Sequence, residues 1–315
     1  MRLKLLLAGV VAGIVTIVSI LPAAAAAAAA ENEAALPAGF KASTVTTADG
    51  AQLYVRTGGG GPAVVLIHGF GDTGDMWAPL AARLARSHTV IVPDLRGMGL
   101  SSKPPGGYDK RSQAQDIRTI LTSLGQDRAA VVGHDIGTMV AYAYAARYPA
   151  SVSRLVVMDA PLPGIAPWDA LIVRPQFWHF NFGGKDAERL VAGRERIYLD
   201  RFWNEFAGDP ARISEATRAH YARLYSRPGA MRAAFAQFNS IVALDVADNR
   251  APGATRLTMP VLAVGGEKSM GATVAAMMRN VASDVREVVV PGAGHWLMEE
   301  VPELTIRLVE DFVAQ

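Results

Sequence analysis

Short apolar segments recur along the chain, and segments with helical periodicity separate them. The first, residues 63–67, contains no polar residue, which is typical of a strand buried on both faces of a parallel sheet. Largely apolar segments of the same kind lie at residues 89–92, 129–132, 154–158, 261–264 and 285–290. Helical patterns lie at residues 76–86, 112–124, 136–148 and 302–313. This alternation predicts an α/β fold, a mostly parallel, doubly wound sheet with helices on both faces. Ahead of it, residues 42–47 and 52–56 flank Asp49-Gly50 and predict a β-hairpin.

The alternation is interrupted between residues 161 and 251, where aromatic residues, arginines and helix formers replace the apolar segments. We interpret residues 161–251 as a helical cap inserted into a core made of residues 31–160 and 252–315. Strand–helix alternation resumes after Met259-Pro260, which favours an insertion over a separate C-terminal domain.

The first 30 residues have the pattern of an export signal. A short basic start, Met1-Arg2-Leu3-Lys4, precedes an apolar run over residues 5–21 and an alanine-rich stretch that ends near Ala30. This order is typical of a secretory signal peptide, residues 1–30, cleaved after small residues. The alternative is a retained membrane anchor, since the apolar run is close to the lower limit for a span. We therefore expect a secreted or periplasmic protein with no membrane association after cleavage.

The composition restricts the partners of the mature chain. It contains no cysteine, which excludes disulfides and lipid attachment at cysteine and leaves an exported domain dependent on packing alone. Cleavage of the signal peptide removes Arg2 and Lys4 from the 31 basic residues, which leaves as many basic residues as the 29 acidic ones. This balance argues against nucleic acid or an anionic membrane as a partner. No cluster has the spacing of a metal site and no phosphate-binding loop is present. We expect a small-molecule substrate, no cofactor and no metal, and a homodimer remains open.

The segment Gly133-His134-Asp135-Ile136-Gly137 lies where an apolar strand gives way to a helical pattern. A turn tight enough to present one side chain above the sheet strains the backbone, and flanking glycines relieve the crowding. A carboxylate at the following helix N-terminus is favoured by the helix dipole, so Asp135 is a candidate nucleophile. The alternative is a simple N-cap, a common role for aspartate before a helix.

Three further segments favour the nucleophile. His68-Gly69-Phe70-Gly71 follows an apolar strand, and the backbone N–H of Phe70 with that of Ile136 would form a two-donor oxyanion hole. His295 lies in a loop after the last strand as a candidate general base. Asp159 ends the strand that follows the turn and is placed to orient His295, with Glu267 as an alternative acid. The order nucleophile, acid, base matches the order expected in this architecture.

Together these motifs resemble the α/β-hydrolase family, and within it the branch of epoxide hydrolases and dehalogenases that use an aspartate nucleophile. Residues 133–138 match the family's small-x-nucleophile-x-small-small turn, and Gly97-Met98-Gly99-Leu100-Ser101 matches its glycine-serine motif. The strongest likeness is to secreted bacterial epoxide hydrolases of the Cif-like group, in the motifs at 68–71 and 294–296 and in Trp178-His179-Phe180. The resemblance covers almost the whole mature chain.

The resemblance implies an α/β-hydrolase fold, epoxide hydrolase activity and a role for His179 as the proton donor that opens the ring. A carboxylate that attacks an sp3 carbon forms an alkyl ester, and water activated by His295 then attacks the ester carbonyl to release a vicinal diol. A serine in place of Asp135 would indicate acyl esters instead. Haloalkane dehalogenases of this branch usually carry Trp after the nucleophile, and haloacetate dehalogenases carry Arg there and near the helix start. Ile136 and Met139 occupy these positions, which argues against both classes.

One position departs from the family pattern. Epoxide hydrolases of this branch pair the cap donor with a tyrosine, and the matching segment late in the cap places Phe238 there. Either His179 acts alone, or the substrate is not an epoxide, or another side chain supplies the proton, such as Gln237, Tyr221 or Tyr225. The leading hypothesis is a secreted epoxide hydrolase that uses no cofactor. The alternatives are a hydrolase or dehalogenase of another substrate with the same triad, and a secreted factor with a vestigial site.

Overall fold

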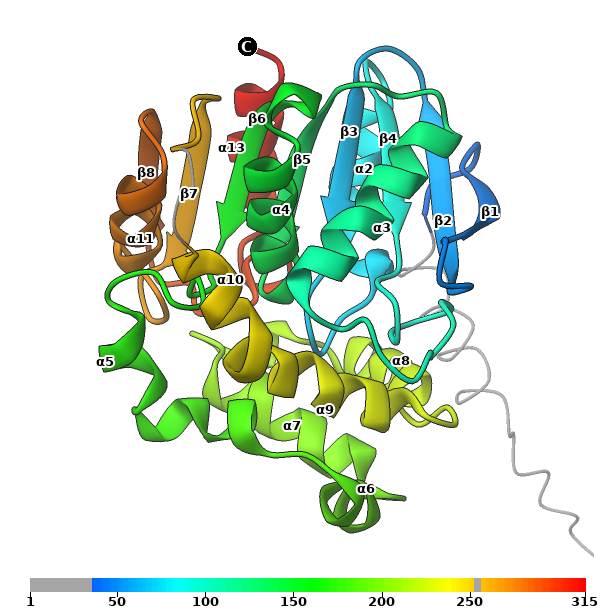
Figure 1. Ribbon diagram of the computed structural model, residues 1–315, viewed down its shortest axis with the longest axis vertical. Helices are drawn as coiled ribbons and strands as arrows, with labels where there is room; N and C mark the ends of the chain where they lie inside the picture. Colours follow the sequence, from blue (N-terminus) through cyan, green and yellow to red (C-terminus); the bar gives the residue numbers. More distant parts are fainter. Residues whose placement is uncertain (1–35, 252–255) are drawn as a thin grey trace, which may run out of the picture.

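Each of the apolar segments forms a strand of one sheet in the computed structural model, which describes residues 36–251 and 256–315 (Figure 1). The signal peptide expected at residues 1–30 lies outside the described residues. The strands are β1 (Lys41–Thr46), β2 (Gln52–Gly59), β3 (Ala63–Ile67), β4 (Thr89–Pro93), β5 (Ala129–His134), β6 (Val152–Met158), β7 (Val261–Gly266) and β8 (Val285–Val290). Their spatial order is β1-β2-β4-β3-β5-β6-β7-β8, with β1–β2 and β2–β4 antiparallel and the other pairs parallel. The predicted α/β fold with a mostly parallel sheet is confirmed.

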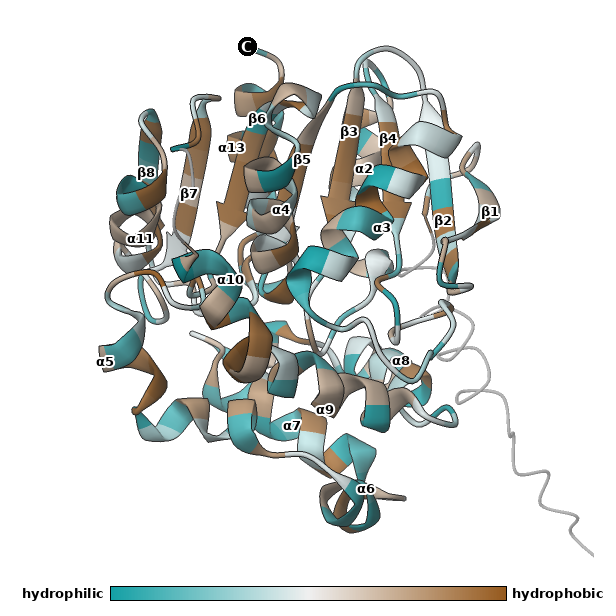
Figure 2. Cartoon of the chain, in the orientation of Figure 1, coloured by the Kyte–Doolittle hydropathy of each residue, from teal (hydrophilic) through white to brown (hydrophobic). Residues whose placement is uncertain are grey.

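Helices cover both faces of the sheet because its central strands are apolar on both sides. The covering helices are α2 (Ala78–Leu84) and α13 (Pro302–Val313) on one face, and α3 (Lys110–Ser123), α4 (Ile136–Arg147) and α11 (Thr273–Val281) on the other. Val64 and Leu66 of β3 pack toward the first pair, and Val65 and Ile67 toward the second group. Figure 2 shows these strands in the brown of hydrophobic residues. Each such buried side chain contributes about 1.5–3 kcal/mol relative to exposure.

The segment between β6 and β7 is helical and lies beyond the carboxyl ends of the parallel strands (Figure 1). Its elements are α5 (Trp168–Ile172), η3 (Pro175–Asn181), α6 (Lys185–Val191), α7 (Glu195–Glu205), η4 (Pro210–Arg212), α8 (Glu215–Tyr225), α9 (Ala230–Ser240), the π-helical turn η5 (Ile241–Asp245) and α10 (Val246–Arg250). In this position the helices close over the loops that follow each strand. Among the helices that the structure describes, none is long and apolar enough to cross a membrane.

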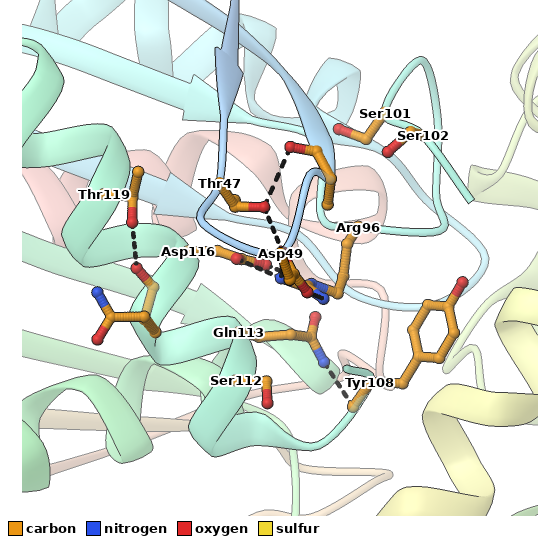
Figure 3. Close-up of polar contacts among 12 residues, drawn as sticks. Thr47, Asp49, Arg96, Ser101, Ser102, Tyr108, Ser112, Gln113, Asp116 and Thr119 are labelled. Carbon is orange, nitrogen blue, oxygen red and sulfur yellow. Dashed lines mark hydrogen bonds and ion pairs between the residues drawn. The ribbon is translucent and has the colours of Figure 1, made fainter. Parts of the chain in front are cut away.

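A buried arginine holds the loop after β4 in place (Figure 3). Arg96 forms a bidentate pair with Asp116 of α3, at 2.6 and 2.5 Å, and a further bond of 2.8 Å to Asp49 in the β1–β2 turn. The side chain of Gln237 in α9 donates to the carbonyl of Arg96 at 3.0 Å and accepts from Gln113 at 2.7 Å. The same loop is thereby tied to α3, to the hairpin and to α9.

Candidate active site

The turn between β5 and α4 has the strained backbone expected for a presented side chain. Asp135 adopts φ 51° and ψ −123°, a conformation that costs a non-glycine residue about 1–3 kcal/mol. A Cβ on Gly133 would lie 2.2 Å from the carbonyl oxygen of Gly137, and one on Gly137 would lie 2.1 Å from that of Ile67. Glycine is therefore required on both sides of Asp135.

Replacement of Gly137 by alanine is expected to destabilise the fold, because the atoms nearest to the new Cβ are backbone atoms of Ile67 and His68, at the end of β3, which cannot move aside as a side chain can. Overpacking of this kind costs about 1–3 kcal/mol, occasionally more, and urea unfolding measures it as a lower midpoint. The matched control is Gly106→Ala, since nothing lies within 4 Å of a Cβ at Gly106, and a change within about 0.5 kcal/mol is expected. Equal effects of the two changes would contradict a steric role for Gly137.

The two carboxylate oxygens of Asp135 have different surroundings. Oδ1 accepts a hydrogen bond of 2.7 Å from the backbone N–H of Phe70. The N–H of Ile136 belongs to the first turn of α4, whose N–H groups have no partner within the helix. Oδ2 lies 3.7 Å from Nε2 of His295. A Cβ on Gly69 would lie 2.6 Å from Oδ1, so the glycine-rich turn leaves room for this oxygen.

His295 and Asp159 form a hydrogen-bonded pair behind Asp135. Nδ1 of His295 lies 2.8 Å from Oδ2 of Asp159. Burial alone would lower the pKa of His295, but its hydrogen bond to Asp159 and the charges of Asp159 and Asp135 raise the pKa above its usual value. Burial alone would raise the pKa of Asp159, yet the bond to His295 holds that pKa below its usual value. This pairing leaves Nε2 of a neutral His295 free to accept a proton.

Three further donors orient Asp159, none of which the sequence indicated as functional. Oδ1 accepts from the N–H groups of Gly266 and Met270, at 2.9 and 3.2 Å, and Oδ2 accepts from the hydroxyl of Ser269 at 2.6 Å. The alternative acid, Glu267, is exposed and accepts instead from the N–H of Gly292 at 2.8 Å. The geometry therefore pairs the candidate base with Asp159 alone.

His179 lies in η3 above Asp135 and is 4% exposed. Its Nδ1 is 3.0 Å from the carbonyl oxygen of Gln176, which only accepts, so the proton of the neutral ring is on Nδ1. Burial lowers the pKa of His179 to about 3. The negative charge of Asp135 opposes this shift, and the positive charge of Arg201 adds to it. The resting ring is neutral, and its Nε2 carries a lone pair rather than a proton.

Phe238 occupies the position opposite His179. Its ring meets the imidazole edge to face with a centroid distance of 4.9 Å. Gln237 is bonded to Arg96 as described above, and the hydroxyl of Tyr225 bonds to backbone atoms of the loop at residues 71–72. Tyr221 is also buried away from the cavity. Of the described residues that line the cavity, none is a tyrosine.

The cavity between these groups has a volume of about 280 Å³. Besides the site residues, it is lined by the aromatic side chains of Phe70, Phe177, Phe180, Phe202, Phe206, Phe238 and Trp296 and by the polar side chains of Arg174, Gln176, Glu205, Lys268, Ser269 and Thr273. In the part of the chain that the structure describes, no three His, Cys, Asp or Glu side chains are grouped as metal ligands. His134 is fully buried and bonds through Nε2 to the carbonyl of His295 at 2.8 Å. The cavity thus combines an apolar interior with Asp135, His295 and His179.

Comparison with known proteins shows similarity over most of the chain. A family model described as alpha/beta hydrolase fold matches residues 62–302. The soluble epoxide hydrolase of Corynebacterium sp. strain C12 is 33% identical over 277 residues, which cover 84% of this chain and 95% of that protein. The 2-(acetamidomethylene)succinate hydrolase of Mesorhizobium japonicum is 33% identical over 83% of this chain and 91% of its own. The crystal structure of wild-type Cfl2 from Burkholderia cenocepacia has a TM-score of 0.82 and 34% identity, covering 87% of this chain and 96% of that chain.

Proposed function

Because this chain belongs to the alpha/beta hydrolase fold family and is a hydrolytic enzyme of its epoxide hydrolase branch, we propose that it converts epoxides to vicinal diols through an ester on Asp135. The observation that carries the proposal is that the two oxygens of Asp135 have different partners. Oδ1 lies at the N–H of Phe70 and Oδ2 lies at Nε2 of His295. A carboxylate so placed suits attack on an sp3 carbon, followed by hydrolysis of the resulting ester.

In the first step Oδ2 of Asp135 attacks an epoxide carbon. A C–O bond forms to the carboxylate, the ring C–O bond breaks, and its electron pair goes to the ring oxygen, which takes a proton. His179 is the proposed donor. Since its Nδ1 proton is held by the carbonyl of Gln176, the donating form is the imidazolium with a second proton on Nε2. Because burial lowers the pKa of His179 to about 3, this form is scarce at neutral pH, and ring opening is expected to limit the rate.

In the second step water attacks Cγ of the ester on Asp135. Nε2 of His295 takes a proton from the water, and the charge that develops on Oδ1 is stabilised by the N–H groups of Phe70 and Ile136. When the tetrahedral intermediate collapses, His295 returns its proton to the departing oxygen and the diol is released. The other proton of the water is lost from Asp135 to solvent, which restores the carboxylate, and it balances the proton that His179 gave to the ring oxygen and takes up again from solvent. The sum is one epoxide and one water for one diol.

The test of the proposal is a single turnover in water enriched in ¹⁸O. The protein, in excess, is mixed with a series of terminal epoxides, and with a haloalkane and a haloacetate as the competing substrate classes. An ester route puts the label into a carboxylate oxygen of Asp135 and leaves the first diol with an unlabelled oxygen from the protein. Label in the first diol would exclude the ester, and the absence of diol from every epoxide would exclude the activity. Asp135→Ser is the inactive reference.

A tyrosine in place of Phe238 is expected to accelerate ester formation. A phenol at this position would offer the ring oxygen a neutral donor, and a positioned proton donor contributes about 10²–10⁴-fold, of which we expect roughly 10–100-fold because His179 already acts. Stopped-flow mixing with a terminal epoxide measures the step, and ester hydrolysis should be unchanged. Phe177→Tyr is the matched control, since this ring lines the same cavity but lies 6.3 Å from His179. An unchanged rate in Phe238→Tyr would show that proton donation does not limit ring opening.

The proposal includes export. The basic start and the apolar run over residues 1–30 support a cleaved signal peptide and a secreted or periplasmic location for the mature chain. The near-equal numbers of acidic and basic residues in that mature chain support a small molecule as its partner.

A further inference from the structure

A buried carboxylate behind the candidate base has no part in the steps above. Glu300 ends the short helix α12 (Leu297–Glu300) and is 7% exposed. Its Oε2 accepts from the backbone N–H groups of Gly208 and Asp209, at 2.7 and 3.1 Å. Its Oε1 accepts from the N–H of Trp296 at 3.1 Å, and the N–H of Gly294 lies 3.1–3.2 Å from both oxygens. One carboxylate therefore joins two backbone segments.

The first of these segments follows α7 in the cap, and the second is the loop that carries His295. They also contact each other directly: the N–H of His295 donates to the carbonyl of Phe206 at 2.8 Å, and the indole of Trp296 donates to that of Phe202 at 3.2 Å. A Cβ on Gly294 would lie 2.1 Å from the backbone nitrogen of Gly208, so the two backbones touch. We call residues 206–209 and 293–296, together with Glu300, the clamp.

One side chain of the clamp, that of Phe206, lies close to both histidines of the cavity. The ring of Phe206 lies 5.8 Å from that of His179 and 6.2 Å from that of His295, measured between centroids. Because the backbone of His295 is bonded to Phe206, the position of its imidazole depends on how firmly the cap segment is held. Hydrogen bonds to a charged carboxylate are stronger than those between neutral groups, which suits Glu300 to this task.

We propose that Glu300 is a positioning residue, which holds the clamp closed and thereby sets Nε2 of His295 at the distance from Asp135 that ester hydrolysis requires. The inference rests on the proposed function, since it assigns Glu300 to the second step of that reaction. Ester formation uses Asp135 and His179 and does not need His295. Loss of Glu300 should therefore separate the two steps.

Glu300→Gln tests the proposal, because glutamine keeps the size of the side chain but its NH₂ group accepts no hydrogen bond. Ester formation from a terminal epoxide should stay within about threefold of the wild type, whereas hydrolysis should slow by about 10–100-fold, as expected for a misplaced catalytic group. The ester would then accumulate and be visible by intact-protein mass spectrometry. Glu303→Gln is the matched control, since Glu303 is exposed on α13 and its replacement removes the same charge.

Hydrogen exchange shows whether the clamp itself has loosened. The amides of Gly208, Asp209, Gly294 and Trp296 should exchange faster in Glu300→Gln, while those of α4 keep their protection. If Glu300→Gln does not fold, Glu300→Asp retains the charge at a shorter reach and takes its place in both measurements.

An unchanged rate of hydrolysis, or an equal slowing of both steps, would overturn the role of Glu300 and leave the proposed function intact. Diol formation by the wild-type chain without ¹⁸O in Asp135, or no diol from any epoxide, would overturn the proposed function and this inference with it.

Discussion

Replacement of His295 by glutamine is expected to stop the reaction after its first step and to leave the chain esterified on Asp135. Ester formation needs the carboxylate and a ring-opening donor, whereas ester hydrolysis needs a base for the attacking water. Nε2 of His295 lies 3.7 Å from Oδ2 of Asp135 and is the group placed for that task, and an amide there accepts no proton. General-base catalysis contributes about 10²–10⁴-fold, so ester hydrolysis should slow by roughly 10³-fold. Intact-protein mass spectrometry should show the mass of the chain plus one epoxide.

The position of the added mass completes the test. Peptide mapping should find the epoxide on Asp135, and a double variant with Asp135→Ser should take up none. Turnover near the wild-type rate in His295→Gln, or an adduct on another residue, would contradict the assignment of His295 as the base.

Replacement of Asp159 by asparagine should cost nearly as much, because the surrounding donors dictate how the new amide lies. Oδ1 accepts from the N–H groups of Gly266 and Met270, so the amide oxygen of asparagine will take that position. Its NH₂ group then faces Nδ1 of His295 and donates to it. The imidazole proton is forced onto Nε2, which no longer accepts a proton from water. A tautomer reversed in this way costs serine hydrolases about 10⁴-fold, and we expect a loss of similar order in ester hydrolysis.

The measurement is the decay of a preformed ester, followed by mass after removal of free epoxide. Ser269→Ala is the matched control, since it removes one donor to Oδ2 of Asp159 and leaves the acceptor for His295 in place. A single hydrogen bond of about 0.5–1.5 kcal/mol corresponds to about tenfold or less. Equal losses in the two variants would indicate that Asp159 acts by ordering the loop rather than by selecting the tautomer.

The parallel strands of the core could be predicted to within about two residues at each end, for a physical reason. A strand buried on both faces excludes polar residues along its whole length, so residues 63–67 leave no ambiguity. Helix α11 was not predicted, although its Met277 and Met278 are fully buried. The helix is short, and the residue before its first turn, Ala272, has no side chain that could cap it. Short elements carry little periodic signal of their own.

The candidate site was predictable where it follows the ends of parallel strands. Asp135 and Asp159 come directly after β5 and β6, and such ends meet at one edge of the sheet, so the sequence could bring them together with His295. The hydroxyl of Ser269 and the carbonyl of Gln176 could not be anticipated, because loop and cap conformations depend on packing between distant segments. The tautomer of His179 follows from that carbonyl and was hidden for the same reason.

The neighbouring positions of β6 and β7 in the sheet have a consequence for the helices between them. Leu155 of β6 is paired with Val261 of β7, so the chain leaves the core and returns to it on neighbouring strands. The loss of loop-closure entropy for a long segment inserted between fixed ends is small, since each doubling of its length costs only about 0.6 kcal/mol. Exchange of the intervening helices would thus change the shape of the cavity while the sheet and the turn that carries Asp135 stay the same. The attachments at Gln237 and at the clamp are the positions where such an exchange must be matched to the recipient.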